Sequence, residues 1–537
     1  MTSRSSSDNV FYRFSAIINE ILNEITKNSS NAGKLIGAGW LCETYGVQPV
    51  QPLKFSSSLG KKKTSKRING VDHNTFPLSF EPENTLVAHL KFMFKHERVH
   101  LEFLSRLFEK VGEKEITEWV LREPSGRFSR RIGWFFEWFT DKTLDVPDVK
   151  NAPYVEALEP NRYWTCTSQT RNIPRWRVRD NLPGTGKFCP LVLLTDSVRQ
   201  ALHEVDISRA LSGLEEEFGA DLLLRSSLWL TIKESRASFE IEGERDLKKT
   251  ERFAIAMEQY LGQIPDVYGA GMLKIQREIL GERSTHYGVR QSPIFIGQTT
   301  RFQQIIHYVA PPPSEIPSLL EGLEDCNVRT QTTNSLIRAA VLSFGFVYIH
   351  PFADGNGRMS RFLINDVLRK DGLVKPPFLV PVSANILKNR TAYDEVLDVV
   401  SAPFRMRYAT EWRFGKEIRY SDGVVSNLEF DSYDDANHVW KYIDFTDHVT
   451  YLAKIISVTI NQEIHQEATY LRQHQATRDQ LRTVFSVNDN SLDRIMRSVT
   501  ENGKISEKLK AEFPLLQEAQ IGEQVLTLLL NMNNAVS

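Results

Sequence analysis

Cysteine is scarce in this sequence, with only four cysteines among 537 residues. They lie far apart, and no two of them form a C-x-x-C pair; they are Cys42, Cys166, Cys189 and Cys326. A disulfide framework or a cysteine-based zinc site needs closely and regularly spaced cysteines. The sequence therefore predicts reduced, buried thiols, as in a cytosolic protein.

Long apolar runs are missing as well. No run of about 18 apolar residues occurs, which argues against a membrane-spanning helix. The first nine residues are polar and contain no apolar segment of the kind found in secretory signal peptides. We therefore expect a cytoplasmic protein with no membrane partner.

An excess of charge of one sign is also missing, because the formal net charge is -1 at pH 7. Such a balance gives no overall attraction to nucleic acid or to anionic lipid. One local basic run, at residues 61–67, lies in a stretch rich in serine and glycine. We interpret that run as a solvated loop.

The length and the hydrophobic pattern predict several domains, since 537 residues exceed what a single core can organise. We expect a mainly α fold, with a helical core that contains a short β-hairpin and with mostly helical flanking domains. The expected parts are an N-terminal domain over 1–200, the core over 201–410, a connecting helical segment over 411–470, and a helical or winged-helix-like domain over 471–537.

One segment of the core carries a pattern suited to phosphate chemistry, His350-Pro-Phe-Ala-Asp-Gly-Asn-Gly-Arg-Met-Ser-Arg361. The residues before it, 336–349, are apolar enough for a buried helix, which Pro351 should stop. Gly355 and Gly357 allow a tight turn with exposed N–H groups. The next helix is expected over 358–369, and its N-terminus would be a site for anions.

The side chains of this segment suit the same chemistry. Arg358 and Arg361 are three residues apart, on one helical face, and both can bind phosphate oxygens in a bidentate manner. Asp354 is a hard oxygen ligand, suited to a magnesium ion shared with phosphates. His350 is the group whose pKa suits it to take a proton near neutrality.

The segment resembles the signature of the Fic family, H-P-F-x-[D/E]-G-N-G-R-x-x-R, and matches every specified position. The resemblance implies that His350 deprotonates a hydroxyl on the target and that Asp354 holds Mg²⁺. It also implies that Asn356 and the backbone of 355–357 hold the α- and β-phosphates of ATP. Arg358 and Arg361 would hold the β- and γ-phosphates, and Phe352 would anchor the loop.

Two further stretches resemble parts of the same family. Gly288-Val289-Arg290 precedes a run that would form a hairpin flap beside the nucleotide and pair with an extended target segment; its residues are Ile294, Phe295, Ile296 and Gly297. Residues 389–393 resemble the stretch near the adenine, which would place Tyr393 there. Asp394 replaces a second tyrosine of that pattern, so recognition of the base stays open.

An inhibitory helix with the pattern [S/T]-x-x-x-E-[G/N] is known in many members of the family. Residues 79–84 and 238–243 both fit, but Pro82 would break a helix in the first segment. The second lies in a proline-free amphipathic stretch, 232–247, at the start of the family-like region. There Glu242, with Ser238 and Gly243, would form the inhibitory motif, and Glu242 would pair with Arg361.

Three other patterns in the sequence resemble motifs of different function. The zincin-like sequence at 96–100, H-E-x-x-H, has Arg98 at a position that a buried zinc helix keeps uncharged, so we interpret it as a solvated helix face. Residues 182–188 lack the first glycine of a P-loop and are interpreted as a turn. The C-terminal helix-turn pattern has no basic excess, which favours protein contact over DNA contact.

The sequence thus predicts an autoinhibited enzyme that transfers AMP from ATP to a Ser, Thr or Tyr hydroxyl of a target protein and requires Mg²⁺. Homo-oligomerisation is possible on this sequence. Three alternatives stay open: removal of AMP from a modified protein, transfer of another phosphate-containing group, and a nucleotide-sensing regulator with a DNA-binding tail.

Overall fold

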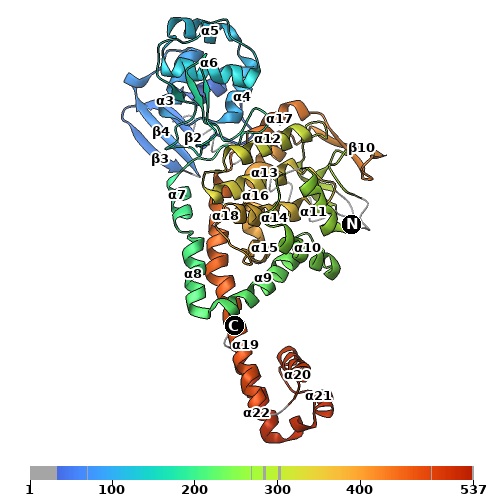
Figure 1. Ribbon diagram of the computed structural model, residues 1–537. Coiled ribbons are helices and arrows are strands. Elements are labelled where there is room, and N and C mark those ends of the chain that lie inside the picture. The colour runs from blue at the N-terminus through green and yellow to red at the C-terminus, as the bar shows by residue number, and fades with distance from the viewer. Residues whose placement is uncertain are drawn as a thin grey trace, which may run out of the picture. The chain divides into compact units, whose positions relative to one another are not determined.

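The computed structural model describes residues 33–68, 70–267, 269–281, 286–299, 304–484 and 487–534 (Figure 1). Helices dominate these residues and the strands are short, which confirms the predicted mainly α fold. The chain divides into two compact units. Among the described residues, unit 1 comprises 33–191, 400–411 and 431–444, and unit 2 comprises 192–399, 412–430 and 445–534.

Unit 1 combines a helical layer with two small sheets. The first sheet has the order β1-β2-β4-β3, with β2 and β4 parallel, and the second has the order β5-β7-β6. Its elements are β1 (Leu35–Ile36), α2 (Ala38–Tyr45), β2 (Phe55–Gly60), β3 (Thr64–Ile68), β4 (Val71–Pro77), η1 (Leu78–Phe80), α3 (Leu86–His96), α4 (Leu101–Lys110), α5 (Glu113–Arg122), α6 (Arg127–Thr140), β5 (Val155–Glu156), β6 (Arg171–Ile173), β7 (Val178–Asp180) and α17 (Tyr433–Lys441).

The zincin-like pattern of unit 1 does not lie on one helix. Helix α3 ends at His96, and His100 caps the start of α4, where its Nδ1 accepts a hydrogen bond from the Phe103 amide at 3.2 Å. The two histidines therefore lack the i and i+4 helical geometry that zinc binding requires. The P-loop-like stretch is a tight turn, in which Thr185 and Phe188 exchange two backbone hydrogen bonds.

Unit 2 is a helical assembly with two hairpins. Its elements are α7 (Asp196–His203), α8 (Ile207–Phe218), α9 (Ala220–Ile241), α10 (Leu247–Tyr260), α11 (Ala270–Leu280), β8 (Phe295–Thr299), β9 (Gln304–Val309), α12 (Ile316–Arg329), α13 (Ser335–Ile349), α14 (Asn356–Lys370), α15 (Val382–Lys388), β10 (Trp412–Arg419), β11 (Val425–Phe430), α18 (Thr446–Val458), the π-helical η2 (Thr459–Ile464), α19 (His465–Val484), α20 (Asp489–Asn502), α21 (Glu507–Glu512), η3 (Pro514–Gln517) and α22 (Ala519–Asn534). Helix α16 (Arg390–Arg407) begins in unit 2 and continues into unit 1.

The centre of unit 2 is the pair α13 and α14, which lie side by side. Helix α13 is apolar along its length, and nearly every residue in it is buried. Asn334 fixes its start, because the Asn334 side chain accepts hydrogen bonds from the amides of Leu336 and Ile337. A buried helix of this kind holds its C-terminal end, and the loop that follows, in a rigid position.

Residues 411–470 differ from the expected connecting helical segment. They begin with the antiparallel hairpin β10–β11, whose tip is a turn with Gly423 at a φ of 83°. Such a φ favours glycine, and the turn reverses the chain. The helical pattern resumes only at Tyr433.

The C-terminal part of unit 2 forms a small helical cluster. Buried apolar residues of α19, α20, α21, η3 and α22 share one core. Among the described residues 487–534 no strand occurs, so the wing of a winged helix is not found there. Throughout the described parts of the chain, none of the helices has the length and apolar character needed to span a membrane.

Close packing in unit 1 generates a stability prediction at Gly133 in α6. A Cβ at this position would lie 2.4 Å from the ring of Trp176, which is buried. Gly133→Ala should therefore lower the free energy of unfolding by about 1–3 kcal/mol, although alanine favours helix. Calorimetric scans should show a lower Tm for this variant.

Gly213→Ala is the matched control. Gly213 lies within α8 and has nothing within 4 Å of the added Cβ, so this substitution should keep or raise the Tm. If Gly133→Ala were as stable as Gly213→Ala, the tight contact with Trp176 would be contradicted.

Candidate active site

The candidate site begins where helix α13 ends. His350 is its C-terminal cap, in a left-handed conformation with φ 48°, and its amide donates to the Phe346 carbonyl at 2.9 Å. Histidine rarely adopts this conformation, which costs free energy that the surrounding packing must supply. The twist turns the chain out of the helix, so that the next residues form a separate loop.

The imidazole of His350 is partly buried, and its Nδ1 lies 3.3 Å from the Val347 carbonyl. A carbonyl can only accept, so the proton belongs on Nδ1 and Nε2 is left as an acceptor. Burial, and then the positive charge of Arg290, lower the pKa of His350 to about 3. The side chain is therefore neutral near pH 7 and able to take up a proton through Nε2.

The loop after His350 is held by its own side chains and by a neighbouring segment. The Asn356 amide group accepts from the Phe352 amide at 2.8 Å and donates to the Phe352 carbonyl at 2.7 Å. Phe352 is buried and also pairs in antiparallel fashion with Val289. Arg290, fully buried, donates from Nε to the His350 carbonyl at 2.8 Å. These contacts fix the loop in one shape.

Helix α14 starts directly after this loop. Gly355 precedes it with φ 89°, a left-handed conformation that glycine adopts without a steric penalty. The free N–H groups of the first turn and the helix dipole make this end suitable for an anion. Asp354 lies beside it with 37% of its side chain exposed, 2.8 Å from Nη2 of Arg358.

Arg358 is almost fully buried and is surrounded by carboxylates. Its Nε lies 2.8 Å from Glu242, its Nη2 lies 2.8 Å from Asp354, and its Nη1 lies 3.5 Å from Glu244. The guanidinium also stacks over the ring of Phe239, with Cζ 4.7 Å from the ring centroid. A buried cation needs such partners, because an unpaired charge in this position would cost several kcal/mol.

Arg361 lies one helical turn further and meets the end of helix α9. Its Nε donates to the Ser238 hydroxyl at 2.8 Å, and its Nη2 donates to the Ser238 carbonyl at 2.7 Å. The same Nη2 donates to Glu242 at 2.8 Å. Glu242 therefore bridges Arg358 and Arg361, which are the two arginines that the sequence singled out.

Gly357 makes this approach possible. A Cβ at Gly357 would lie 2.2 Å from Oε1 of Glu242 and 3.0 Å from Nη1 of Arg361. Only a residue without a side chain leaves room for the carboxylate at the start of α14. The same space in front of the helix would be needed by any phosphate that binds there.

The helix that carries Glu242 is longer at its start and shorter at its end than expected. It runs over 220–241 rather than 232–247, and Glu242 is its C-terminal cap. Gly243 follows with φ 77°, and the amide of Glu244 donates to the Phe239 carbonyl. This left-handed glycine ends the helix and turns the chain, which explains the small residue in the pattern.

The flap is the antiparallel pair β8 and β9. Phe295 pairs with Val309 and Ile296 with Tyr308, and the register shifts between Ile296 and Gly297. A Cβ at Gly297 would lie 2.1 Å from the Ile305 carbonyl oxygen, so this position needs glycine. The hydroxyl of Tyr308 donates to the Tyr348 carbonyl at 3.0 Å, which ties the flap to α13. The pairing extends one residue beyond β8, because the Ile294 carbonyl accepts a hydrogen bond from the amide of Ala310.

Tyr393 of α16 is buried close to Arg361. Burial raises the pKa of its hydroxyl, while the charge of Arg361 opposes that rise. Asp394, which replaces the expected tyrosine, is exposed and lies 3.9 Å from Nε of Arg390. The structure thus brings Tyr393 close to Arg361 and leaves Asp394 at the surface.

Sequence reasoning missed two acidic residues of this site. Glu244 follows Glu242 by two positions and contacts both Arg358 and Lys249. Glu234 lies one turn before Ser238 and accepts from the amide and hydroxyl of Ser383. Burial raises the pKa of Glu234 to about 7, and the hydrogen bonds from Ser383 act in the opposite direction. The signal for Glu234 was an acid on the buried face of an amphipathic helix.

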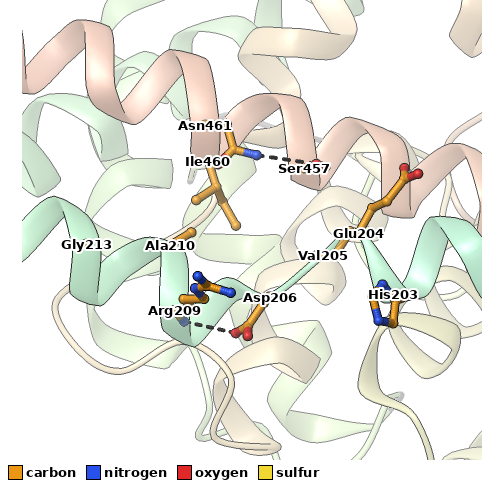
Figure 2. A pocket seen from close by; sticks show the side chains of 10 residues that line it. All are labelled: His203, Glu204, Val205, Asp206, Arg209, Ala210, Gly213, Ser457, Ile460 and Asn461. Carbon is orange, nitrogen blue, oxygen red and sulfur yellow. Dashed lines mark hydrogen bonds between the residues drawn. The ribbon is translucent and has the colours of Figure 1, made fainter.

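A separate pocket of unit 2 lies away from this site. Figure 2 shows residues of α8, α18 and η2 around it, together with the end of α7 and the residues between α7 and α8. None of its lining residues belongs to 350–361 or to the flap. Within the described parts of the chain, no group of three His, Cys, Asp or Glu residues is arranged to hold a metal ion by itself.

Residues 270–368 match the Fic/DOC family model. Over 113 residues the chain is 29% identical to protein adenylyltransferase fic-1 of Caenorhabditis elegans, covering 21% of this chain and 20% of that protein. Over 115 residues it is 31% identical to protein adenylyltransferase Fic of Drosophila willistoni, covering 20% and 21%. The chain thus spans about a fifth of the length of the curated relatives it matches.

Two solved structures also match. One is a Fic family protein from Desulfovibrio desulfuricans G20, with a TM-score of 0.35, 17% identity, and coverage of 57% of this chain and 80% of that one. The other is a Fic domain containing signaling protein from Bacteroides thetaiotaomicron, with a TM-score of 0.34, 14% identity, and coverage of 52% and 97%.

The helix–loop–helix site and the hairpin β8–β9 both lie within the residues that match this family model. Residues 270–368 therefore form a Fic/DOC domain within the chain. Ser238 and Glu242 lie outside the matched residues, yet they contact Arg361 inside it.

The environment of His350 predicts its charge state. With a pKa of about 3 in the folded protein, His350 should stay neutral from pH 8 down to pH 5. Protein with ¹⁵N-labelled histidine, compared with His350→Ala to assign the signals, should show one neutral tautomer throughout. The native state binds fewer protons here than the unfolded chain, whose histidine pKa is about 6.5. Stability should therefore fall as the pH is lowered from about 6.5 toward 3. An inflection near pH 6.5 in the His350 signals would contradict the buried environment.

Proposed function

We propose that this chain transfers AMP from ATP to a hydroxyl group of a target protein. The single observation that carries the proposal is the folded segment 350–361, in which a neutral imidazole ends helix α13 and two buried arginines lie in the first turns of α14. The curated relatives that match this region are named protein adenylyltransferases, which supports the same chemistry.

In the proposed reaction the target oxygen forms a bond to the α-phosphorus of ATP. The bond between that phosphorus and the oxygen leading to the β-phosphate breaks, and pyrophosphate leaves. The hydroxyl proton passes to Nε2 of His350, which is the free acceptor of the ring. Positioning and charge neutralisation supply most of the remaining rate, as is usual for transfer at phosphorus.

The phosphates would bind at the start of α14. Backbone N–H groups of the first turn point there, and Arg358 and Arg361 would pair with the β- and γ-phosphates. We assign Asn356 to the shape of the loop, because both ends of its amide group already bind Phe352. The flap at 294–297 would cover the nucleotide and pair with an extended segment of the target.

Asp354 fits the role of a magnesium ligand. Magnesium bound with ATP commonly takes one or two protein carboxylates, and phosphates and water complete its shell. Asp354 is the partly exposed carboxylate at the start of the phosphate site. Bound there, Mg²⁺ would neutralise part of the phosphate charge.

Glu242 would act as the inhibitor of this site. Its carboxylate neutralises Arg358 and Arg361, which are the groups that the β- and γ-phosphates require. ATP would then bind with its γ-phosphate displaced and its α-phosphate poorly aligned for attack. Ser238 would hold Arg361 in this state, and Gly243 would place Glu242 at the helix end.

Removal of AMP from a modified protein is a second candidate, because Glu242 also places a carboxylate beside the same arginines. In that reaction Glu242 would position the attacking water. The two functions predict opposite effects of losing Glu242, and the variant described below separates them.

The first functional prediction concerns His350. Incubation with ATP labelled at the α-phosphate should label protein in a lysate, and His350→Ala should lower the rate by about 100-fold or more, because the base is lost. Binding of ATP should stay within about threefold of wild type, since the phosphates contact other groups. Equal labelling by wild type and His350→Ala would overturn the proposed mechanism.

The second functional prediction concerns Glu242. Glu242→Gly should raise the labelling rate by about 10- to 1000-fold, because it frees both arginines for the phosphates. The control is Glu240→Gln, an acid of the same helix that pairs with Arg245 at the surface. It should label at the wild-type rate.

Unchanged labelling by Glu242→Gly at every ATP concentration would show that the contact of Glu242 with the two arginines is only structural. Loss of AMP removal in that variant would favour the second candidate.

A further inference from the structure

The tip of the β10–β11 hairpin carries a carboxylate that binds the base of the flap. One oxygen of Asp422, Oδ2, accepts from the amide of Gln291 at 2.7 Å, from the amide of Ser292 at 2.9 Å and from the Ser292 hydroxyl at 2.8 Å. The other oxygen accepts from the amide of Val424 at 3.0 Å, within the turn itself. Asp422 thus joins two segments that are about 130 residues apart.

The turn is built to present this carboxylate. Tyr420 donates to the Val424 carbonyl and Gly423 donates to the Tyr420 carbonyl, which closes a tight turn around Asp422. Strand β10 is exposed along nearly all its length, so the hairpin contributes little to the core.

The contact leads directly to the candidate site. Ser292 is fully buried, and its carbonyl accepts from Nη1 of Arg290 at 2.8 Å. The same arginine donates to the His350 carbonyl. On the other side of Ser292 the chain continues into β8. There the ring of Phe295 packs against the ring of Phe414 of β10, with 5.5 Å between the ring centroids. The hairpin therefore holds the flap at its base and along its first strand.

The charge of Asp422 strengthens the attachment. Partial burial acts to raise its pKa, but the hydrogen bonds from Gln291, Ser292 and Val424 outweigh burial and leave the pKa below its usual value. Asp422 is therefore a carboxylate at neutral pH. Hydrogen bonds from backbone N–H groups to an ionised carboxylate are among the stronger ones in proteins.

We propose that Asp422 is a positioning residue for the flap. Through Asp422, the β10–β11 hairpin, which lies outside the matched Fic/DOC region, sets how firmly the flap holds the target segment. This inference rests on the proposed function. A target that pairs with the flap must place its hydroxyl within reach of His350, and a displacement of about 1 Å can cost 100-fold in rate. The nucleotide phosphates bind at α14, so they depend less on the flap.

The first test is hydrogen exchange of the full-length chain, and it needs no activity. Asp422→Ala should speed exchange of the amides of residues 289–297 by about tenfold or more, because the acceptor for Gln291 and Ser292 is lost. Asp422→Asn keeps one acceptor oxygen and should give an intermediate effect. The control is Glu417→Ala, an exposed acid on β10 of the same hairpin, which should leave exchange in this segment unchanged.

The second test measures labelling with α-labelled ATP, using a serially diluted cell lysate as the source of target protein. All variants carry Glu242→Gly, which raises the signal. Asp422→Ala should raise the lysate concentration for half-maximal labelling by about 5- to 50-fold, and should change the half-saturating ATP concentration less than that. The Glu417→Ala control should match its parent in both.

Unchanged exchange in Asp422→Ala would overturn the attachment, and faster exchange with an unchanged lysate requirement would overturn its role in holding the target. If the parent labels no protein at all, the proposed function fails. The exchange result then decides by itself whether Asp422 holds the flap.

Discussion

Two guanidinium groups buried at one helix N-terminus are the constraint on which the rest of the site depends. Arg358 and Arg361 are each almost fully buried, so they need negative partners at all times. In this structure Glu242 supplies that charge to both. In the proposed reaction the β- and γ-phosphates would take its place. In this proposal, inhibition and binding of the β- and γ-phosphates would use the same two cations, so the phosphates could reach their full contacts only after Glu242 has moved away.

Small residues and one buried acid make this arrangement possible. Gly357 leaves the space that the Glu242 carboxylate fills, and Gly243 turns the chain so that Glu242 reaches it. Glu234 then links the same helix to the start of α15 through Ser383. Burial raises the pKa of Glu234 to about 7. Ionisation of the group that forms this link therefore costs free energy, because a buried charge lacks the solvation that water gives it. Helix α9 and the residues that follow it are thus held at several points, by contacts that differ in their chemistry.

The flap depends on contacts that come from distant parts of the chain. Arg290 ties its base to His350, Tyr308 ties its second strand to α13, and Asp422 ties its base to a later hairpin. A two-stranded hairpin is marginally stable alone, so these contacts decide where it lies. The position of the flap is therefore a property of unit 2 as a whole.

The sequence by itself determined the mainly α fold, the helix–loop–helix around 350–361, the hairpin near 295 and the choice of 238–243 over 79–84. Each of these depends on local signals, such as Pro351, the glycines and the helical period of apolar residues, which act through neighbouring residues. Only the tertiary structure decided that Glu242 bridges two arginines, that Glu244 contacts Arg358 and Glu234 binds Ser383, and that residues 412–430 form a hairpin attached to the flap. Those contacts join residues more than 100 positions apart, and an isolated acid such as Asp422 carries no local signal of its partner. Packing of helices and strands brings such groups together, and the local pattern contains no information about that packing.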